Sequence, residues 1–232
     1  MDTCKKYLAY YTCFYGSNNN IAFKIPELPS NKYECYYYTN NTDLYDKLLE
    51  TKWIRIFIDK PTTDDVIESC MAAKEVKVLP EKYKEIQDYE YTVFLDSKLN
   101  LLNESLIENF IETYFVQQDY ALLLRRHWYI NNVWDEFNES LRYHQRYRMH
   151  EEIYRNYINE QINSGLSVNT NDIHCACGLL IRNMKHPKMK EIDSLWYEHI
   201  NKCGIQDQIS FFFAKQFFDG YIHAFGEYPF LV

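Results

Sequence analysis

Asp96 is the residue whose position most directly suggests chemistry. It follows an apolar run of strand length, residues 91–95, and it precedes Ser97 and Lys98. An ionised carboxylate at the end of a buried strand is costly to desolvate unless a metal ion, a helix N-terminus or a base compensates it. We interpret Asp96 as a ligand for Mn²⁺ or Mg²⁺, which prefer oxygen donors. The alternative is that Asp96 caps the helix or turn that begins near Leu101.

Two further residues could act on a bound substrate. His127 follows two arginines after the predicted strand 120–124, and it could contact a metal, a phosphate or a sugar hydroxyl. Asp207 could deprotonate an acceptor hydroxyl in an inverting reaction, or it could orient a sugar. Each has a structural alternative: His127 could be a hydrogen-bonded loop residue, and Asp207 could cap the helix that follows it.

The elements that must position these residues alternate along the chain. Apolar runs predict strands over residues 7–15, 33–39, 53–58, 91–95, 120–124 and 175–181. Amphipathic stretches predict helices over residues 64–77, 106–115, 132–162 with at most one break, 187–202 and 207–218. Because parallel strands need crossover connections, this order predicts an α/β fold with a single, mostly parallel, Rossmann-like sheet flanked by helices.

The length of 232 residues favours one domain, residues 1–232. Residues 1–100 hold most of the strands and would form a donor half, and residues 101–232 hold most of the helices and would form an acceptor half. Ligands of open α/β sheets bind beyond the carboxyl ends of the strands. We therefore expect the residues at the strand exits to converge on one crevice. They are Gly16, Thr39, Asn40, Asn41, Asp96, Ser97, Lys98, His127 and Arg182.

The composition excludes several classes of protein. A net charge of −8 and a pI near 5.4 argue against nucleic-acid binding. No stretch approaches the roughly 20 apolar residues of a transmembrane helix, and the N-terminus lacks the features of a signal peptide. The seven cysteines are odd in number and lie mostly in apolar runs, so we expect reduced thiols, no disulfides and a cytoplasmic location.

Familiar short motifs are missing. His174, Cys175 and Cys177 lack a second pair of ligands at zinc spacing, so a buried structural role is favoured. The chain has no Gly-rich dinucleotide fingerprint, no Gly-Lys-Ser/Thr phosphate loop and no Gly-Xaa-Ser-Xaa-Gly elbow. The simplest dehydrogenase, kinase and esterase interpretations are therefore excluded.

Several segments together resemble the pattern of one family. They are residues 11–16, 36–41, 77–80, 94–98, His127 with 134–136, 178–182, 196–198 and 207–211. In this order they resemble the glycosyltransferase-like domains of GT-A fold found in plant mucilage-related proteins, bacterial polysaccharide loci and large DNA viruses. The segment 94–98 resembles the part of the family pattern that stands in for a DXD motif. Three residues depart from the pattern: Trp128 stands in place of a proline, and Ile130 and Gln206 each stand in place of an arginine.

The resemblance implies a metal-dependent glycosyltransferase. The expected donor is a nucleotide-sugar, specifically a UDP-sugar, and the expected acceptor is a glycan or another hydroxyl compound. A chain of this kind is most similar to virus-encoded members, which would place it in the host cytoplasm, and a homodimer is compatible with it. The implied nucleoside contacts are Thr12, Tyr15, Gly16, Thr39 and Asn40, and the implied diphosphate or sugar contacts are Lys77, Ser97, Lys98 and Arg182. Asp96 would bind Mn²⁺ or Mg²⁺, and His127 and Asp207 would act on the acceptor side.

Asp96 is the only carboxylate that remains of a full DXD motif. A second hypothesis is therefore a non-catalytic nucleotide-sugar-binding module that kept the fold. A phosphotransferase or nucleotidyltransferase on the same type of sheet is a third.

Overall fold

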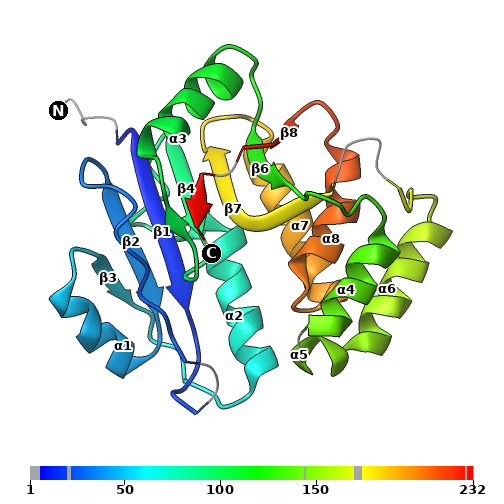
Figure 1. Cartoon of the computed structure of the whole chain (residues 1–232), viewed down its shortest axis with the longest axis horizontal. Coiled ribbons are helices and arrows are strands. Elements are labelled where there is room, and N and C mark those ends of the chain that lie inside the picture. Colours follow the sequence, from blue (N-terminus) through cyan, green and yellow to red (C-terminus); the bar gives the residue numbers. More distant parts are fainter. Residues whose placement is uncertain (1–5, 20–21, 144, 170–173, 228, 232) are drawn as a thin grey trace.

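A seven-stranded sheet crosses the molecule in the order β3-β2-β1-β4-β7-β6-β8 (Figure 1). The structure is a computed structural model that describes residues 6–19, 22–143, 145–169, 174–227 and 229–231. The strands of this sheet are β1 Leu8–Phe14, β2 Glu34–Thr39, β3 Ile54–Phe57, β4 Tyr91–Leu95, β6 Leu122–Arg126, β7 Cys175–Asn183 and β8 Ile222–Phe225. All but β7 run in one direction, because β7 is antiparallel to both of its neighbours, β4 and β6. The predicted α/β fold with a mostly parallel sheet is confirmed.

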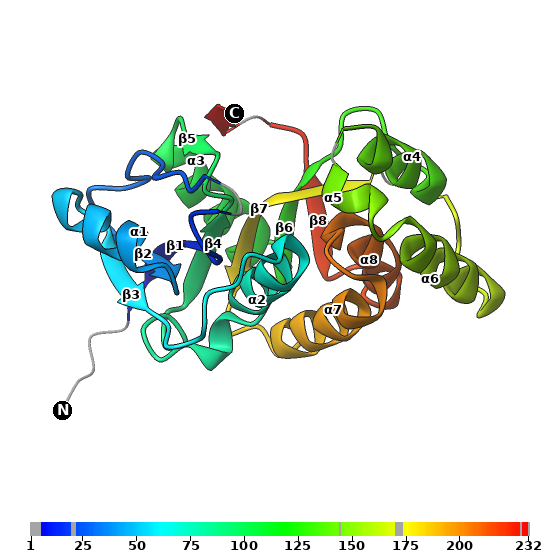
Figure 2. The same cartoon turned by 90° about the horizontal axis from the view of Figure 1, so that it is seen from below.

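Helices cover both faces of this sheet (Figure 2). One face packs against α2 Val66–Val78, α7 Met189–Cys203 and α8 Asp207–Ala214. The other face packs against α1 Thr42–Lys47 and against α3 Glu104–Phe110, which continues as a π-helix over Ile111–Val116. A third group of helices packs beside α8 and comprises α4 Val133–Tyr143, α5 Gln145–Arg148 and α6 Glu151–Asn163.

The sequence explains why these elements form. Successive residues of a strand point to opposite faces, and in β1 the side chains of Leu8 and Tyr10 join one core while Ala9 and Tyr11 join the other. Helix α2 begins where predicted, because Asp65 accepts hydrogen bonds from the N–H groups of Ile67 and Glu68 at 2.7 and 3.1 Å.

Some details differ from the sequence-based expectations. The predicted helix over residues 132–162 is divided into the three helices α4, α5 and α6, and the predicted helix over 207–218 ends at Ala214 and passes into a 3₁₀ turn, Lys215–Phe217. Helix α1, strand β8 and a small antiparallel sheet of β5 Asn100–Leu101 and β9 Phe230–Leu231 were not expected. They are too short to give a periodic signal.

Two other expectations concern the chain as a whole. Over the described ranges, no helix has both the length and the apolar character needed to cross a bilayer. Six cysteines are described and all are free thiols, whereas Cys4 lies outside the described residues.

Candidate active site

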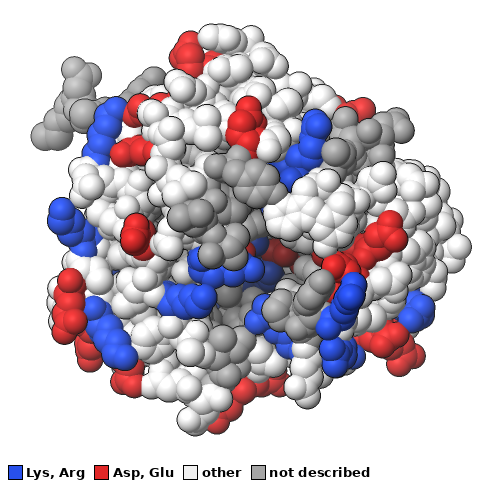
Figure 3. Space-filling model, viewed as in Figure 1, with Lys and Arg blue, Asp and Glu red and all other residues white. Residues whose placement is uncertain are grey.

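A cavity of about 540 Å³ opens at the edge of the sheet where β1, β4 and β6 end and β7 begins. Its size lies within the range of roughly 300–1,000 Å³ that is usual for small-molecule sites. The space-filling view shows basic and acidic side chains side by side around a hollow in the middle of this face (Figure 3). Seven of the residues predicted from the sequence line it, namely Tyr15, Lys77, Asp96, Ser97, Lys98, His127 and Asp207.

Asp96 is held by its backbone and faces the cavity with its carboxylate. Its N–H donates to the carbonyl of Gly178 at 2.8 Å, and its own carbonyl accepts from Leu99 N–H at 2.8 Å. The carboxylate caps no helix, because α3 begins at Glu104 and is capped by Asn103. The helix-capping alternative is therefore wrong, although Asp96 begins the turn 96–99 through its backbone carbonyl. A Cβ atom at Gly178 would lie 3.2 Å from Asp96 Oδ2, so glycine at this position leaves room for the carboxylate.

Two lysines of α2 hold Asp207 at the start of α8. Asp207 Oδ2 lies 2.7 Å from Lys74 Nζ and 2.6 Å from Lys77 Nζ, and Lys77 Nζ lies 3.7 Å from Asp96 Oδ1. Burial alone would raise the pKa of Asp207, but the two lysines hold it well below its usual range. Burial also opposes the charge of Lys77, but Asp207 and Asp96 outweigh it and raise the Lys77 pKa. Because its pKa is lowered in this way, Asp207 is a weak base.

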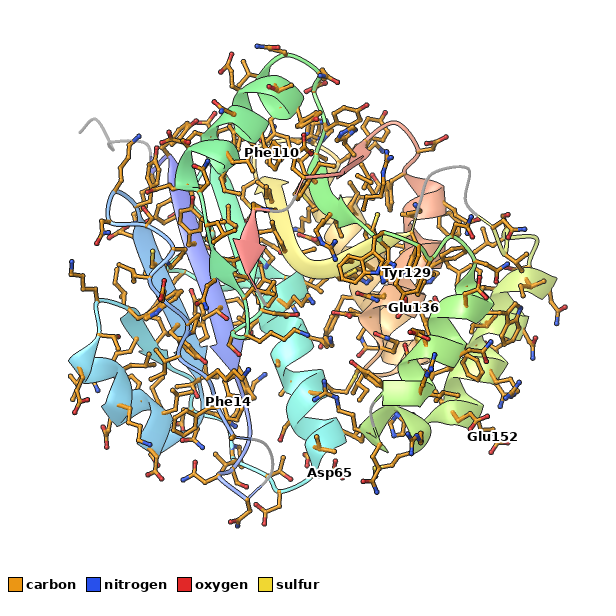
Figure 4. All side chains as sticks on the ribbon, in the orientation of Figure 1. Phe14, Asp65, Phe110, Tyr129, Glu136 and Glu152 are labelled. Carbon is orange, nitrogen blue, oxygen red and sulfur yellow. The ribbon has the colours of Figure 1, made fainter. Side chains whose placement is uncertain are left out.

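Glu136 of α4 organises a buried polar network on the opposite wall (Figure 4). Its Oε1 accepts hydrogen bonds from Gln206 Nε2 at 2.9 Å, from Gln208 Nε2 at 2.7 Å and from Ser140 Oγ at 3.1 Å. Its Oε2 lies 3.2 Å from His174 Nε2. Burial would raise the pKa of Glu136, but His174 and the donated hydrogen bonds lower it. The network keeps a charged carboxylate fixed beneath the cavity.

His127 is neutral and its tautomer follows from its contacts. Its Nδ1 accepts a hydrogen bond from Ile130 N–H at 3.3 Å, which leaves the proton of the neutral ring on Nε2. Burial lowers the pKa of His127 to about 4, although Glu136 acts in the opposite direction. The ring therefore offers an N–H donor at neutral pH.

The expectation that Arg182 lies in this crevice is wrong. Because β7 is antiparallel, its end reaches the opposite edge of the sheet, where Arg182 pairs in register with Thr92 and Leu122 at the starts of β4 and β6. The buried guanidinium contacts both carboxylate oxygens of Asp193 at 3.0 and 3.1 Å. It also donates to Tyr11 Oη and to the carbonyl of Lys77, each at 3.0 Å. Arg182 thus ties β7 to α7, β1 and α2.

Four other predicted contacts shape the site without lining it. The side chains of Thr12 and Thr39 are buried within the sheet. Gly16 has a φ of 124°, which favours glycine, and its N–H donates to Asn40 Oδ1 at 3.0 Å. Asn40 Nδ2 donates in turn to the carbonyl of Pro61 at 3.1 Å. These contacts fix the loop that follows β1, and the adjacent Tyr15 reaches the cavity.

Several cavity residues escaped the sequence-based interpretation. Five basic and four acidic side chains line the cavity, and of these the sequence had not indicated Lys24, Lys74, Arg146, Glu136 and Glu139 as site residues. The only sequence signal for Lys74 is its spacing of three from Lys77, which puts the two on one side of a helix. Glu136 and Gln206 are 70 positions apart, so no local pattern could have joined them.

The residues present fit a particular kind of metal site. Within the part of the chain that the structure describes, no cluster of three or more His, Cys, Asp or Glu side chains could hold a metal ion by itself. Asp96 nevertheless offers a carboxylate that is about one-third exposed to the cavity. Mg²⁺ is commonly bound through one or two carboxylates together with substrate phosphates and waters. The donor set therefore suits a cation that is shared with a bound diphosphate.

The sheet, its helices and this cavity together define an α/β domain of the GT-A-like glycosyltransferase class. Residues 61–223 match the TOD1/MUCI70, glycosyltransferase-like domain, and the chain belongs to this family. It is a glycosyltransferase. The resemblance seen in the sequence is thereby confirmed at the level of the family. No curated protein matches the chain in sequence.

Two solved structures superpose on the chain in part. The apo form of mouse xyloside xylosyltransferase 1 superposes with a TM-score of 0.47 at 10% identity, over 95% of this chain and 84% of that one. The apo structure of the bifunctional glycosyltransferase WbbM superposes with a TM-score of 0.48 at 10% identity, over 97% of this chain and 40% of that one.

Proposed function

We propose that the chain transfers a sugar from a UDP-sugar to a hydroxyl group of a glycan, with Mn²⁺ or Mg²⁺ bound at Asp96. One observation carries the proposal. The Asp96 carboxylate is about one-third exposed to the cavity, and its Oδ1 lies 3.7 Å from the buried Nζ of Lys77. A metal ion bound to a carboxylate and a fixed ammonium group can both compensate the charge of a diphosphate. The exposed Lys24 and Lys98 add positive charge at the rim.

The wall between β1 and α2 suits the nucleoside. Its lining residues combine an aromatic ring with small apolar groups, namely Tyr15, Val66, Cys70 and Ala73. Nucleobases bind between such groups because both of their faces are flat and weakly hydrated. In this arrangement the base lies along α2 and the diphosphate lies toward Asp96.

The metal would be held by Asp96 and would act as a Lewis acid on the departing nucleoside diphosphate. Lys77 stabilises the same negative charge directly, and Asp207 fixes Lys74 and Lys77 in place. Asp207 is poorly suited to act as a general base, because its pKa lies far below the working pH and the ion pairs with two lysines oppose its protonation. We assign Asp207 the role of orienting these two lysines.

His127 has a different role on the acceptor side. Its Nδ1 is occupied by Ile130 N–H and its ring is neutral, so it acts as an Nε2–H donor to a hydroxyl or phosphate oxygen. Glu136 of α4 accepts hydrogen bonds from Gln206 and Gln208, and these bonds hold α4 against the start of α8.

Replacing Asp96 by Asn tests the metal assignment. We expect D96N to weaken Mn²⁺-dependent binding of UDP by at least about tenfold, or about 1.4 kcal/mol, because the amide carries no charge for the cation. The thermal midpoint should hardly change, since the ion pair of the Asp96 carboxylate with Lys77 is long, at 3.7 Å, and the carboxylate is about one-third exposed. Calorimetry with UDP, with and without Mn²⁺, measures the effect.

Asp59 provides the matched control, because it is an exposed aspartate that follows β3 but does not line the cavity. D59N should bind UDP and Mn²⁺ as the wild type does. A folded D96N variant with undiminished metal-dependent binding would overturn the assignment of Asp96.

The second candidate function is a non-catalytic nucleotide-sugar-binding module. The observation that favours it is that Asp96 stands without a second carboxylate of a DXD motif. Hydrolysis of UDP-sugars in the presence of Mn²⁺ separates the two functions. Metal-dependent UDP binding without any turnover of a panel of UDP-sugars would favour the module, and slow hydrolysis would favour the enzyme.

A further inference from the structure

Two neighbouring aromatic rings project at the rim of the cavity. Trp128 and Tyr129 follow β6, and their side chains are 57% and 59% exposed. Tyr129 lines the cavity, and its ring centroid lies 4.9 Å from that of His127. Figure 4 shows Tyr129 on the same side of the cavity as Glu136. Isolated exposed rings are common on protein surfaces, so the question is whether these two are held in place.

The backbone on both sides of the rings is fixed. His127 N–H donates to the carbonyl of His174 at 2.5 Å, and His174 N–H donates to the carbonyl of Ile130 at 3.1 Å. Ile130 N–H also donates to His127 Nδ1, and the Ile130 side chain is buried. The residues before and after the pair are therefore anchored to the start of β7, which leaves Trp128 and Tyr129 displayed outward.

Each ring has a polar partner, one at the hydroxyl group of Tyr129 and one over the ring of Trp128. Tyr129 Oη donates to Glu139 Oε1 of α4 at 3.0 Å, and the Arg125 guanidinium lies 4.7 Å from the Trp128 ring centroid. The two rings are 6.0 Å apart with 32° between their planes. The two exposed rings, called the Trp128–Tyr129 platform below, lie next to each other, and Tyr129 borders the cavity.

We propose that the Trp128–Tyr129 platform is the acceptor subsite, and that it binds a neutral pyranose ring of a saccharide by stacking. This inference rests on the proposed function, because it supplies the glycan acceptor that the reaction needs. The face of an aromatic ring is electronegative and attracts the polarised C–H groups on the apolar side of a pyranose. The half-buried carboxylate of Glu139 on this wall accepts hydrogen bonds from hydroxyl groups, and its charge and that of the buried Glu136 disfavour an anionic ring.

Tryptophan fluorescence tests the platform without any donor. Trp53 and Trp196 are buried and Trp134 is half-buried, so Trp128 is the tryptophan most exposed to added ligands. The probes are cellotetraose and the methyl β-glycosides of glucose, galactose and xylose, titrated into the full chain. We expect a saturable change in emission with at least one saccharide. It should be lost in W128A and shifted to about tenfold higher concentration in Y129A.

F217A is the matched control, because Phe217 is 56% exposed but does not line the cavity. It should respond as the wild type does, and thermal melts of all three variants should confirm that they are folded. No response to any saccharide, an undiminished response in W128A, or a response only to a serine- or threonine-containing peptide would each overturn the platform.

UDP calorimetry on the same samples separates this inference from the proposed function. W128A should keep the UDP affinity of the wild type, because its ring does not line the donor cavity. If the wild type binds saccharide through Trp128 but does not bind UDP, the donor assignment fails and the platform stands. If UDP binds and the saccharides do not, the platform fails and the donor assignment stands.

Discussion

Asp207 and Glu136 are both buried carboxylates of one cavity, and their neighbours give them different roles. Asp207 lies within 2.7 Å of two ammonium groups, and its negative charge forms ion pairs that hold Lys74 and Lys77 in position. Glu136 faces amides, a hydroxyl and an imidazole, so its charge is stabilised by donated hydrogen bonds. Asp207 does not readily accept a proton, because it is paired with two cations. Glu136 does not readily change its position, because several donors form hydrogen bonds to its carboxylate.

His127 gives the stability of the protein a defined dependence on pH. Its folded-state pKa is lowered to about 4, chiefly by burial, whereas the unfolded value is near 6.5. Between these values the unfolded chain binds a proton that the folded chain does not, so the free energy of unfolding should fall as the pH decreases from about 6.5 to about 4. Replacement by glutamine, which does not titrate, should remove this component.

Urea titrations of the wild type and H127Q at pH 4.5, 5.5, 6.5 and 7.5 measure the difference between the two. As the pH falls, the free energy of unfolding of the wild type should decrease more than that of H127Q. The difference reports His127 alone, because both proteins share every other titrating group. Parallel pH profiles for the two proteins would contradict a neutral, buried His127.

At the scale of elements, the direction of β7 determines which of the predicted residues lie at the cavity. Local sequence signals were sufficient for β4, an apolar run, for α7, an amphipathic stretch, and for α2, which has acidic residues at its start and lysines toward its end. The direction of β7 leaves no such signal, since a strand has the same alternation in either direction. As a result Gly178, near its start, meets Asp96, and Arg182, near its end, does not.

The sequence accordingly predicted part of the candidate site as single residues, but not the contacts between them. Asp96, His127 and Asp207 stand out in the sequence because each follows or begins an element. The pairing of Asp207 with Lys74 joins residues 133 positions apart, and it exists only because α8 packs against α2 in the folded chain. Long-range packing of this kind has no local sequence signal.

Arg182 should therefore be essential to the fold. R182M leaves the Asp193 carboxylate buried without its partner, and removal of one member of such a pair costs about 3–5 kcal/mol. Urea unfolding should show this loss, and the double variant R182M/D193L should recover most of it, because neither charge then remains. An R182M protein that keeps its stability but loses UDP affinity would contradict the structural role.

At the scale of the whole molecule, a net charge of −8 should repel an anionic donor. The lining of the cavity does not share this excess of negative charge, since it contains five basic and four acidic side chains. In salt, the distant surface charges are screened more strongly than charges in contact with the ligand. The local cations should thus determine donor binding.

Two charge reversals with the same effect on the net charge test whether position matters more than total charge. Lys98 lines the cavity beyond β4, whereas Lys52 precedes β3 and so lies at the opposite edge of the sheet. K98E should weaken UDP binding roughly tenfold, about 1.4 kcal/mol, in 0.1 M salt, and K52E should change it little. Raising the salt to 1 M shortens the screening length from about 10 Å to about 3 Å, so the effect of K98E should shrink. Equal losses of UDP affinity in K98E and K52E would mean that the total charge, rather than the cations of the cavity, governs the binding of the donor.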